Sequence, residues 1–334
     1  MSSDLFIDDL KELQIEIHML GHKLQGECII FCIRNKDIPI YSGLIDCYED
    51  NDKILTSFLE FLGIKYINFC CWTHPHWDHC RGFDQLLESQ LFNEDTSYYL
   101  PEGVFKNTLD QISNSEYNLE LIKILNKKFA RFLKTNSLSV TTREKRQINL
   151  KTFKSNNQIN EKVDLIIEII APNSAIIRKE LDSDKGKPNS FSIAFILHFG
   201  NIFKVFLGGD IENETIKLLD KDIFQKIKIL KAPHHSSNGT DEIIKYLEVL
   251  DEKPIVISSV FRNGNSDLPT LKMKQEYRKN SNSFICTGCV DKDEIRISEE
   301  KENFGIISFY HKYDSGIIGY RTDGNTQIYE KENM

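Results

Sequence analysis

The sequence lacks several features that would place it in particular classes of protein. No apolar run approaches the roughly 18 residues of a membrane-spanning helix, so no membrane association is predicted. The acidic N-terminus does not have the basic-then-apolar layout of a secretory signal. Low-complexity linkers and internal repeats are also absent. The single C-x-x-C, Cys286 to Cys289, has no second pair with which to form a zinc knuckle, and we interpret it as incidental.

The composition is that of a globular protein. The chain has 334 residues, of which 40% are hydrophobic and 28% charged, and this length can bury a substantial core. One domain spanning 1–334 is the simplest organisation. Most of the eight cysteines lie in apolar, strand-like segments, as buried and reduced thiols do, so we expect a cytoplasmic protein.

The net charge of −8 is unevenly distributed along the chain. Residues 123–154 include ten basic residues and a single acidic one, Glu144, which gives this segment a local charge of +9. A basic segment on an acidic body favours a docking surface for a polyanion, although a solvated helix face and loop would have the same composition. The residues that we predict to contact nucleic acid are Lys127, Lys128, Arg131, Arg143, Lys145 and Arg146.

Apolar periodicity predicts a mixed α/β chain. The expected strands are 27–33, 39–46, 64–72, 163–170, 191–199, 202–207, 227–231, 254–260 and 283–287, with a β-rich part at 290–334. Gly200-Asn201 predicts a hairpin turn between two of these strands. The expected helices are 53–62, about 84–134, 212–219 and 240–250. Residues 95–160 are interpreted as a helical, basic insertion whose polar part, 135–160, is a loop.

The most informative stretch is Thr73 to His79, which contains an H-x-H-x-D-H cluster. Three imidazoles and a carboxylate lie within six consecutive positions, and histidine is the commonest metal ligand. The preceding residues predict a buried strand, so the cluster lies on a loop at the strand's carboxyl end, where α/β proteins place their chemistry.

Two later strands end in residues of the same kind. Asp210 follows Gly208-Gly209 after one strand, and His234-His235 follow another. Each could be a simple turn or capping residue, but their common position at strand ends favours one joint metal site. The candidate ligands are His74, His76, Asp78, His79, Asp210, His234 and His235.

These motifs occur in an order that resembles the metallo-β-lactamase-fold hydrolases, and within them the hydrolase domain of ComEC-type competence proteins. The resemblance extends over about 22–290. It rests on six segments: Gly26-Glu27-Cys28, Leu44-Ile45-Asp46, the Thr73 to His79 signature, Asn189 to Ser192, Leu207 to Asp210, and Lys231 to Ser237.

The resemblance implies a four-layer αββα sandwich and a site for two divalent ions. His74 and His76 would bind one ion, Asp78 and His79 the other, and Asp210 would bridge them. His234 or His235 would complete the second set. Behind the ligands, Asp46 would orient a histidine, and Asn189 and Ser190 would support the site.

Such a site activates water for hydrolysis, with Asp78 and Asp210 as the catalytic carboxylates. We expect a phosphodiesterase or nuclease that uses a metal-activated hydroxide, with nucleic acid as its partner and two Zn²⁺ as its ions; Mn²⁺ is the alternative. The fold does not select the substrate, so a hydrolase of a lactone, thioester or cyclic nucleotide is a second hypothesis. The third is a partner-binding module with a structural metal site.

Overall fold

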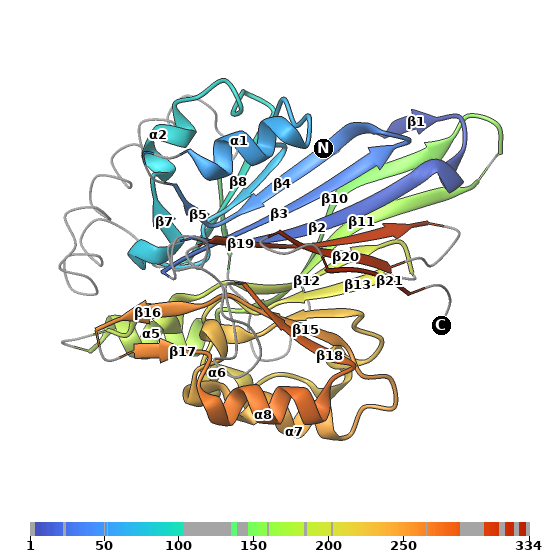
Figure 1. The fold of residues 1–334 in the computed structure, drawn as a ribbon. Helices are drawn as coiled ribbons and strands as arrows, with labels where there is room; N and C mark the ends of the chain where they lie inside the picture. The colour runs from blue at the N-terminus through green and yellow to red at the C-terminus, as the bar shows by residue number, and fades with distance from the viewer. Residues whose placement is uncertain are drawn as a thin grey trace.

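The architecture is mixed α/β and is built around two large sheets (Figure 1). The computed structural model describes residues 4–22, 25–49, 51, 53–102, 135–138, 146–158, 160–183, 186–201, 203–264, 266–287, 304–313, 318–323 and 327–331. No helix within these ranges is long and apolar enough to cross a membrane.

Among the described residues, nine strands form the first sheet, in the order β21-β20-β19-β2-β3-β4-β6-β8-β9. Their bounds are β2 Leu13–His22, β3 Gly26–Asn35, β4 Ile38–Ile45, β6 Phe69–Cys71, β8 Ser97–Pro101, β9 Thr135–Leu138, β19 Phe304–Lys312, β20 Ile318–Asp323 and β21 Gln327–Lys331. β19 pairs antiparallel with β2, so the two ends of the chain share this sheet. From β4 onward the strands run parallel, with their carboxyl ends at one edge.

The second sheet has eight strands in the described residues, in the order β1-β10-β11-β12-β13-β14-β15-β18. Their bounds are β1 Leu5–Ile7, β10 Arg146–Ser155, β11 Lys162–Ala171, β12 Ala194–Phe199, β13 Phe203–Leu207, β14 Ile229–Lys231, β15 Ile255–Ser258 and β18 Ser283–Cys286. β13, β14, β15 and β18 run parallel, so their carboxyl ends also share one edge. Two short ribbons, β5 Cys47–Tyr48 with β7 Cys80–Arg81 and β16 Phe261–Asn263 with β17 Ser266–Leu268, flank the sheets.

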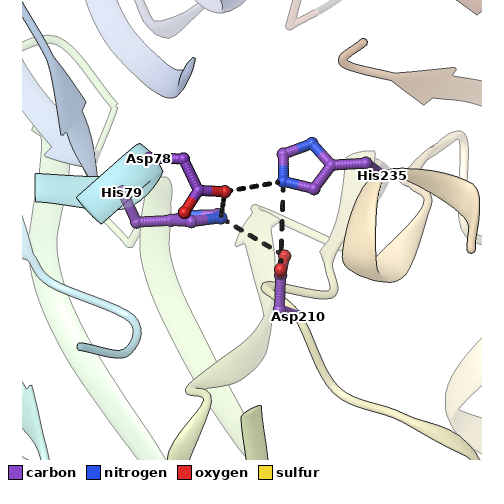
Figure 2. Close-up of side chains that lie close together, drawn as sticks. All are labelled: Asp78, His79, Asp210 and His235. Carbon is purple, nitrogen blue, oxygen red and sulfur yellow. Dashed lines mark hydrogen bonds and ion pairs between the residues drawn. The ribbon is translucent and has the colours of Figure 1, made fainter. Parts of the chain in front are cut away.

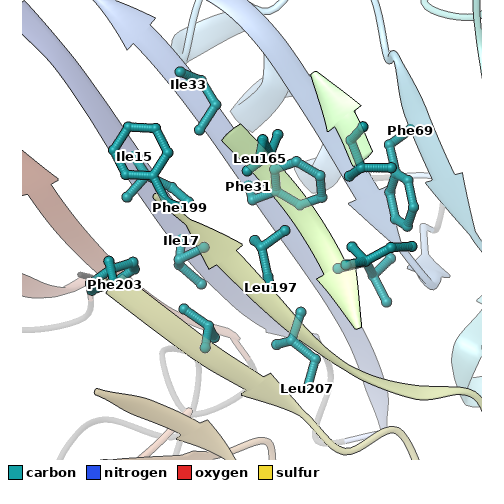
Figure 3. Packing of buried hydrophobic residues seen from close by; sticks show 14 of the residues in the cluster. Ile15, Ile17, Phe31, Ile33, Phe69, Leu165, Leu197, Phe199, Phe203 and Leu207 are labelled. Atoms are coloured by element: carbon teal, nitrogen blue, oxygen red, sulfur yellow. The ribbon is translucent and has the colours of Figure 1, made fainter. Parts of the chain in front are cut away.

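The main hydrophobic core lies between the two sheets (Figure 3). Ile15, Ile17 and Phe31 of the nine-stranded sheet face Leu197 and Leu207 of the eight-stranded one, and all are buried. Alternate residues of each strand therefore point inward, as expected for two packed sheets. The side chains on the opposite faces of the strands are left to be covered by helices.

Helices cover both outer faces. α1 Ile54–Phe61 and α2 Phe83–Leu87 pack on the nine-stranded sheet through an apolar cluster of their own. α6 Asn213–Ile216, α7 Glu242–Glu248 and α8 Leu271–Asn280 cover the eight-stranded sheet through another. α5 Ser174–Leu181 places Ile177 in the cluster of α1 and α2. The remaining short 3₁₀ turns are η1 Leu10–Glu12, η2 Trp77–His79, η3 Pro188–Phe191, η4 Lys221–Phe224, η5 Pro233–Ser236 and η6 Asn238–Thr240.

The sequence-based prediction was correct for the hairpin, because β12 and β13 pair antiparallel around Gly200. Its first strand begins at Ala194 rather than at 191, since η3 occupies the preceding residues. The interpretation of 95–160 as a helical insertion with a terminal loop was wrong for 97–101, 135–138 and 146–155, which are strands of the two sheets. Residues 103–134 lie outside the described part of the chain.

Candidate metal centre

Potential metal-binding side chains converge from both large sheets. Residues 74–79 follow β6 of the nine-stranded sheet. Asp210 follows β13, and His235 follows β14, of the eight-stranded sheet. All these positions lie beyond the carboxyl ends of parallel strands, as the sequence predicts. The site is thus assembled from loops of both sheets, beyond the carboxyl ends of their parallel strands.

Four buried side chains form the first group of potential ligands, Asp78, His79, Asp210 and His235 (Figure 2). Their ligand atoms all lie within 4.8 Å of one another. Nε2 of His235 is 3.2 Å from Oδ2 of Asp78 and 3.8 Å from Oδ2 of Asp210. Nε2 of His79 is 3.4 Å from both carboxylates. Two imidazole nitrogens and two carboxylates therefore point at a common centre.

The second group contains His74, His76 and again Asp210. Nε2 of His74 is 3.0 Å from Nδ1 of His76 and 3.7 Å from Oδ2 of Asp210. Asp210 is the residue common to both groups, which is the position that a bridging carboxylate occupies between two ions.

The structure separates the two neighbouring histidines after β14. His235 belongs to the first group, whereas His234 does not enter either group with its ligand atoms. Nε2 of His234 lies 3.9 Å from Oδ2 of Asp210, and its Nδ1 is 3.2 Å from Glu212. Asn189 donates to the same Glu212 carboxylate at 3.0 Å, and its amide lies 3.4 Å from His234. His234 therefore borders the site from the side of Asp210.

The backbone after β14 explains this separation. His234, His235 and Ser236 all have positive φ angles, of 46°, 48° and 62°. Left-handed backbone is uncommon for residues other than glycine and concentrates at functional sites. Here it turns adjacent imidazoles toward different partners. Gly209 has a positive φ as well, of 50°. This position also requires glycine for a steric reason, because a Cβ would lie 2.5 Å from the Ile193 carbonyl oxygen.

Asp46 fixes the orientation of the histidine loop from behind. Its Oδ2 accepts from Nδ1 of His79 at 2.6 Å and from the Thr73 hydroxyl at 2.6 Å. Its Oδ1 accepts from the Thr73 backbone N–H at 2.7 Å. Because the Thr73 hydroxyl gives its proton to Asp46, it accepts from Nδ1 of His74 at 3.0 Å. Both histidines are thus held with Nε2 toward Asp210, and the contact of Asp46 with His79 is the one that the resemblance implied.

A second buried network positions the eight-stranded side of the site, and the sequence analysis did not include it. The Ser259 hydroxyl donates to Glu27 and accepts from Nδ1 of His235 at 2.7 Å, which directs Nε2 of His235 to the first group. The Lys231 ammonium lies 2.7 Å from the Glu27 carboxylate and donates to the Gly209 carbonyl at 2.8 Å. Glu27 therefore supports both His235 and the turn that carries Asp210.

The signal for this network was present in the sequence. Glu27 and Lys231 are charged residues of opposite sign that border apolar runs, Cys28 to Ile33 and Ile229 to Leu230. Both are buried, with side-chain exposures of 1% and 0%. Charges at such positions are almost always paired.

The electrostatics of the cluster favour a cation. Burial alone would lower the pKa of His79, but the carboxylates of Asp210, Asp46 and Asp78 raise it well above its usual value. Burial alone would raise the pKa of Asp210, but His79, His235 and the other imidazoles lower it well below its usual value. The pKa of Asp78 is lowered by the same kind of contact, against the effect of its burial. Asp78 and Asp210 are therefore ionised inside the protein.

Two buried ligand atoms with no hydrogen-bond partner in the described part of the chain also favour a metal ion at this position. Nε2 of His79 and Oδ1 of Asp210 are buried and form no hydrogen bond with the described residues. Buried polar atoms without a partner are rare, and each calls for a ligand or another explanation. Imidazole nitrogens and carboxylate oxygens are the donors that bind zinc and related divalent ions. The two groups can therefore hold metal.

The other predicted residues are placed as follows. Ser190 is next to Asn189 in η3, partly exposed, with its backbone N–H donating to Lys187. His198, on β12, is not a predicted ligand; it lies 3.2 Å from Glu168 and takes no part in either ligand group. Arg146 is exposed at the start of β10. The remaining residues predicted to contact nucleic acid lie outside the described part of the chain: Lys127, Lys128, Arg131, Arg143 and Lys145.

Comparison with known proteins leaves the chain without a family assignment, since no family model matches it and no curated protein matches it.

Proposed function

We propose that the protein is a metal-dependent phosphodiesterase, acting as a nuclease, and that its single domain has the metallo-β-lactamase fold of ComEC-type hydrolases. The observation that carries the proposal is the sharing of Asp210 between two groups of potential histidine and aspartate ligands, in which only His76 is partly exposed. The layered arrangement of two sheets between outer helices, and the position of the ligands at the strand ends, support the fold.

Two ions would suit this ligand set, and zinc suits its imidazoles best, with manganese as the alternative. Asp78, His79, Asp210 and His235 would hold one ion. His74, His76 and Asp210 would hold the other. When bound, such ions lower the pKa of water and stabilise negative charge on a phosphoryl oxygen.

The chain's own residues would perform the remaining tasks. Asp46 and Ser259 hold Nδ1 of His79 and of His235, so that each Nε2 faces the centre and would offer its lone pair to an ion that displaces its proton. The buried carboxylates keep their charge, because the surrounding imidazoles lower the pKa of Asp210 and Asp78 despite burial. A phosphodiester at this edge would thus meet fixed donors that need little reorganisation during the reaction.

A small-molecule hydrolase is the second candidate function. The observation that favours it is the net charge of −8, which opposes the approach of a polyanion. A lactone, a thioester or a cyclic nucleotide would be its substrate.

The test begins with metal analysis of the purified protein, followed by cleavage assays on single- and double-stranded DNA, RNA, model phosphodiesters and small esters. We expect bound divalent ions, and cleavage of phosphodiesters that a chelator abolishes. Asp210→Asn should lose bound metal and activity together, whereas His198→Gln, a matched control away from the ligand groups, should retain both. A protein that binds no divalent ion, or one that cleaves only small esters, would contradict the nuclease proposal.

A further inference from the structure

Two partly exposed aromatic rings border the ligand groups. Trp77 lies in η2 between His76 and Asp78, which both belong to those groups. Phe261 begins β16, and its ring stacks on that of His235, with centroids 5.2 Å apart and planes at 27°. The Trp77 and Phe261 rings are themselves 6.5 Å apart. Neither ring is buried, in contrast to Trp72, which is 1% exposed in the core.

The ribbon of β16 and β17 has few residues that could pack into the protein. Arg262 and Asn263 are exposed, and so are Ser266 and Asp267. A two-stranded ribbon is only marginally stable by itself. Phe261 and its register partner Leu268 are the partly buried residues of this ribbon, and the Phe261 ring lies against the imidazole of His235.

An arginine side chain lies close to these aromatic rings. The ring of Tyr48 is 5.8 Å from that of Trp77, and the Arg81 guanidinium lies over the Tyr48 ring at 5.6 Å. Arg81 also donates to the Tyr48 hydroxyl at 3.3 Å. Aromatic faces beside an arginine are the combination with which proteins bind single-stranded nucleic acids, since bases stack on the rings and the cation attracts the backbone.

We propose that Trp77 and Phe261 form a stacking site for a nucleobase next to the phosphate to be cleaved, so that the substrate is single-stranded nucleic acid. The inference deepens the proposed phosphodiesterase function and rests on it for the reaction. Binding of the base is a separate property. Aliphatic lactones and thioesters have no aromatic ring to stack on these side chains, and a base-paired nucleotide has its faces covered by its neighbours in the helix.

The chain allows a direct measurement, because it has only two tryptophans and Trp72 is buried. A short single-stranded oligodeoxythymidine with phosphorothioate linkages is titrated into the metal-loaded protein while tryptophan emission is recorded. We expect the oligonucleotide to quench Trp77, and an abasic oligonucleotide of the same length to bind about ten- to a hundredfold more weakly. Trp77→Ala should lose this discrimination, whereas Trp77→Phe, which keeps a ring, should retain most of the affinity but not the quenching.

The comparison of the two oligonucleotides on the unmodified protein decides the matter even where a variant fails to fold. Equal affinity for the base-bearing and abasic forms, or tighter binding of duplex DNA, would overturn the stacking site. Base-dependent binding, with no cleavage of the same oligonucleotide made with ordinary phosphodiester linkages, would sink the phosphodiesterase while leaving the stacking site in place. Cleavage of the base-bearing and abasic phosphodiester forms at the same rate, with equal affinity for both, would overturn the stacking site and leave the phosphodiesterase.

Discussion

The buried ion pair of Glu27 and Lys231 gives a quantitative test of how the site is supported. Replacing Lys231 by Met leaves the Glu27 carboxylate buried without its cation. It also removes the positive charge 3.7 Å from Oδ1 of Asp210. Breaking one side of a fully buried pair costs about 3–5 kcal/mol, because an uncompensated charge remains in the interior. We expect Lys231→Met to lower the free energy of unfolding by about this amount.

A double-mutant cycle with Glu27→Gln separates the free energy of the ion pair from that of side-chain packing. Glu27→Gln leaves Lys231 beside Asp210 and bonded to the Gly209 carbonyl, so its cost should lie near the lower end, about 3 kcal/mol. The double variant removes both charges with little change of volume. It should therefore be more stable than Lys231→Met alone, with a coupling free energy of about 2 kcal/mol.

Urea unfolding followed by circular dichroism, with chelator present throughout, measures these values from the midpoint at constant slope. Lys228→Met is the matched control, because Lys228 pairs with Glu252 at 3.0 Å on the surface, where 39% and 71% of the two side chains are exposed. Its effect should be within about 0.5 kcal/mol. If Lys231→Met costs no more than Lys228→Met, or if the two single effects simply add, the network does not support the site as described.

Two further outcomes follow from pairs elsewhere in the first sheet. Burial opposes ionisation of Glu16, but His18 and Arg34 lower the pKa of this carboxyl below its usual value. The ionised Glu16 therefore stabilises the fold at every pH above the usual pKa of a glutamate. This stabilisation is lost as the pH falls through the lowered pKa. Glu16→Gln should therefore cost about 2 kcal/mol near neutral pH and almost nothing in acid, as urea midpoints at several pH values will show; a cost that does not change with pH would contradict this. Gly43→Ala should lower the free energy of unfolding by about 1–3 kcal/mol, because the added Cβ would lie 2.1 Å from the buried Phe31 ring. In the same urea assay, adding Phe31→Leu should restore part of this loss. A Gly43→Ala variant as stable as the unmodified protein would refute the packing argument.

Sequence periodicity predicted most of the central strands of both sheets, but it missed β2 despite its regular alternation, and only Phe69–Cys71 of the predicted strand 64–72 is a strand. β10 was missed because its pattern changes in the middle. Leu150 and Phe153 are both buried, but the register shifts between Asn149 and Lys151, so the apolar positions are three apart rather than two. A bulge of this kind hides a strand from any test of simple alternation. β8 was missed because its five residues are too few to outweigh the helical pattern around them.

For the candidate site, the sequence predicted which loops meet but not how neighbouring side chains divide between partners. His234 and His235 have the same chemistry and adjacent positions, and only the left-handed backbone directs them to different sides. The contact of Asp46 with His79 was expected from the resemblance. The roles of Glu27 and Ser259 were not, because each depends on a contact between strands that are far apart in the sequence.

The division of the ligands between two sheets makes the core between those sheets part of the metal site. Metal–ligand distances tolerate changes of about 0.2 Å, so an ion held by residues 74–79 and Asp210 would sense any sliding of one sheet over the other. Phe69 of β6 and Phe195 of β12 touch across this interface, with ring centroids 6.0 Å apart. Close-packed interiors transmit such displacements. The affinity of such a site for an ion would therefore depend on how the sheets are aligned, and a void opened at Phe195 would change that affinity without altering any candidate ligand.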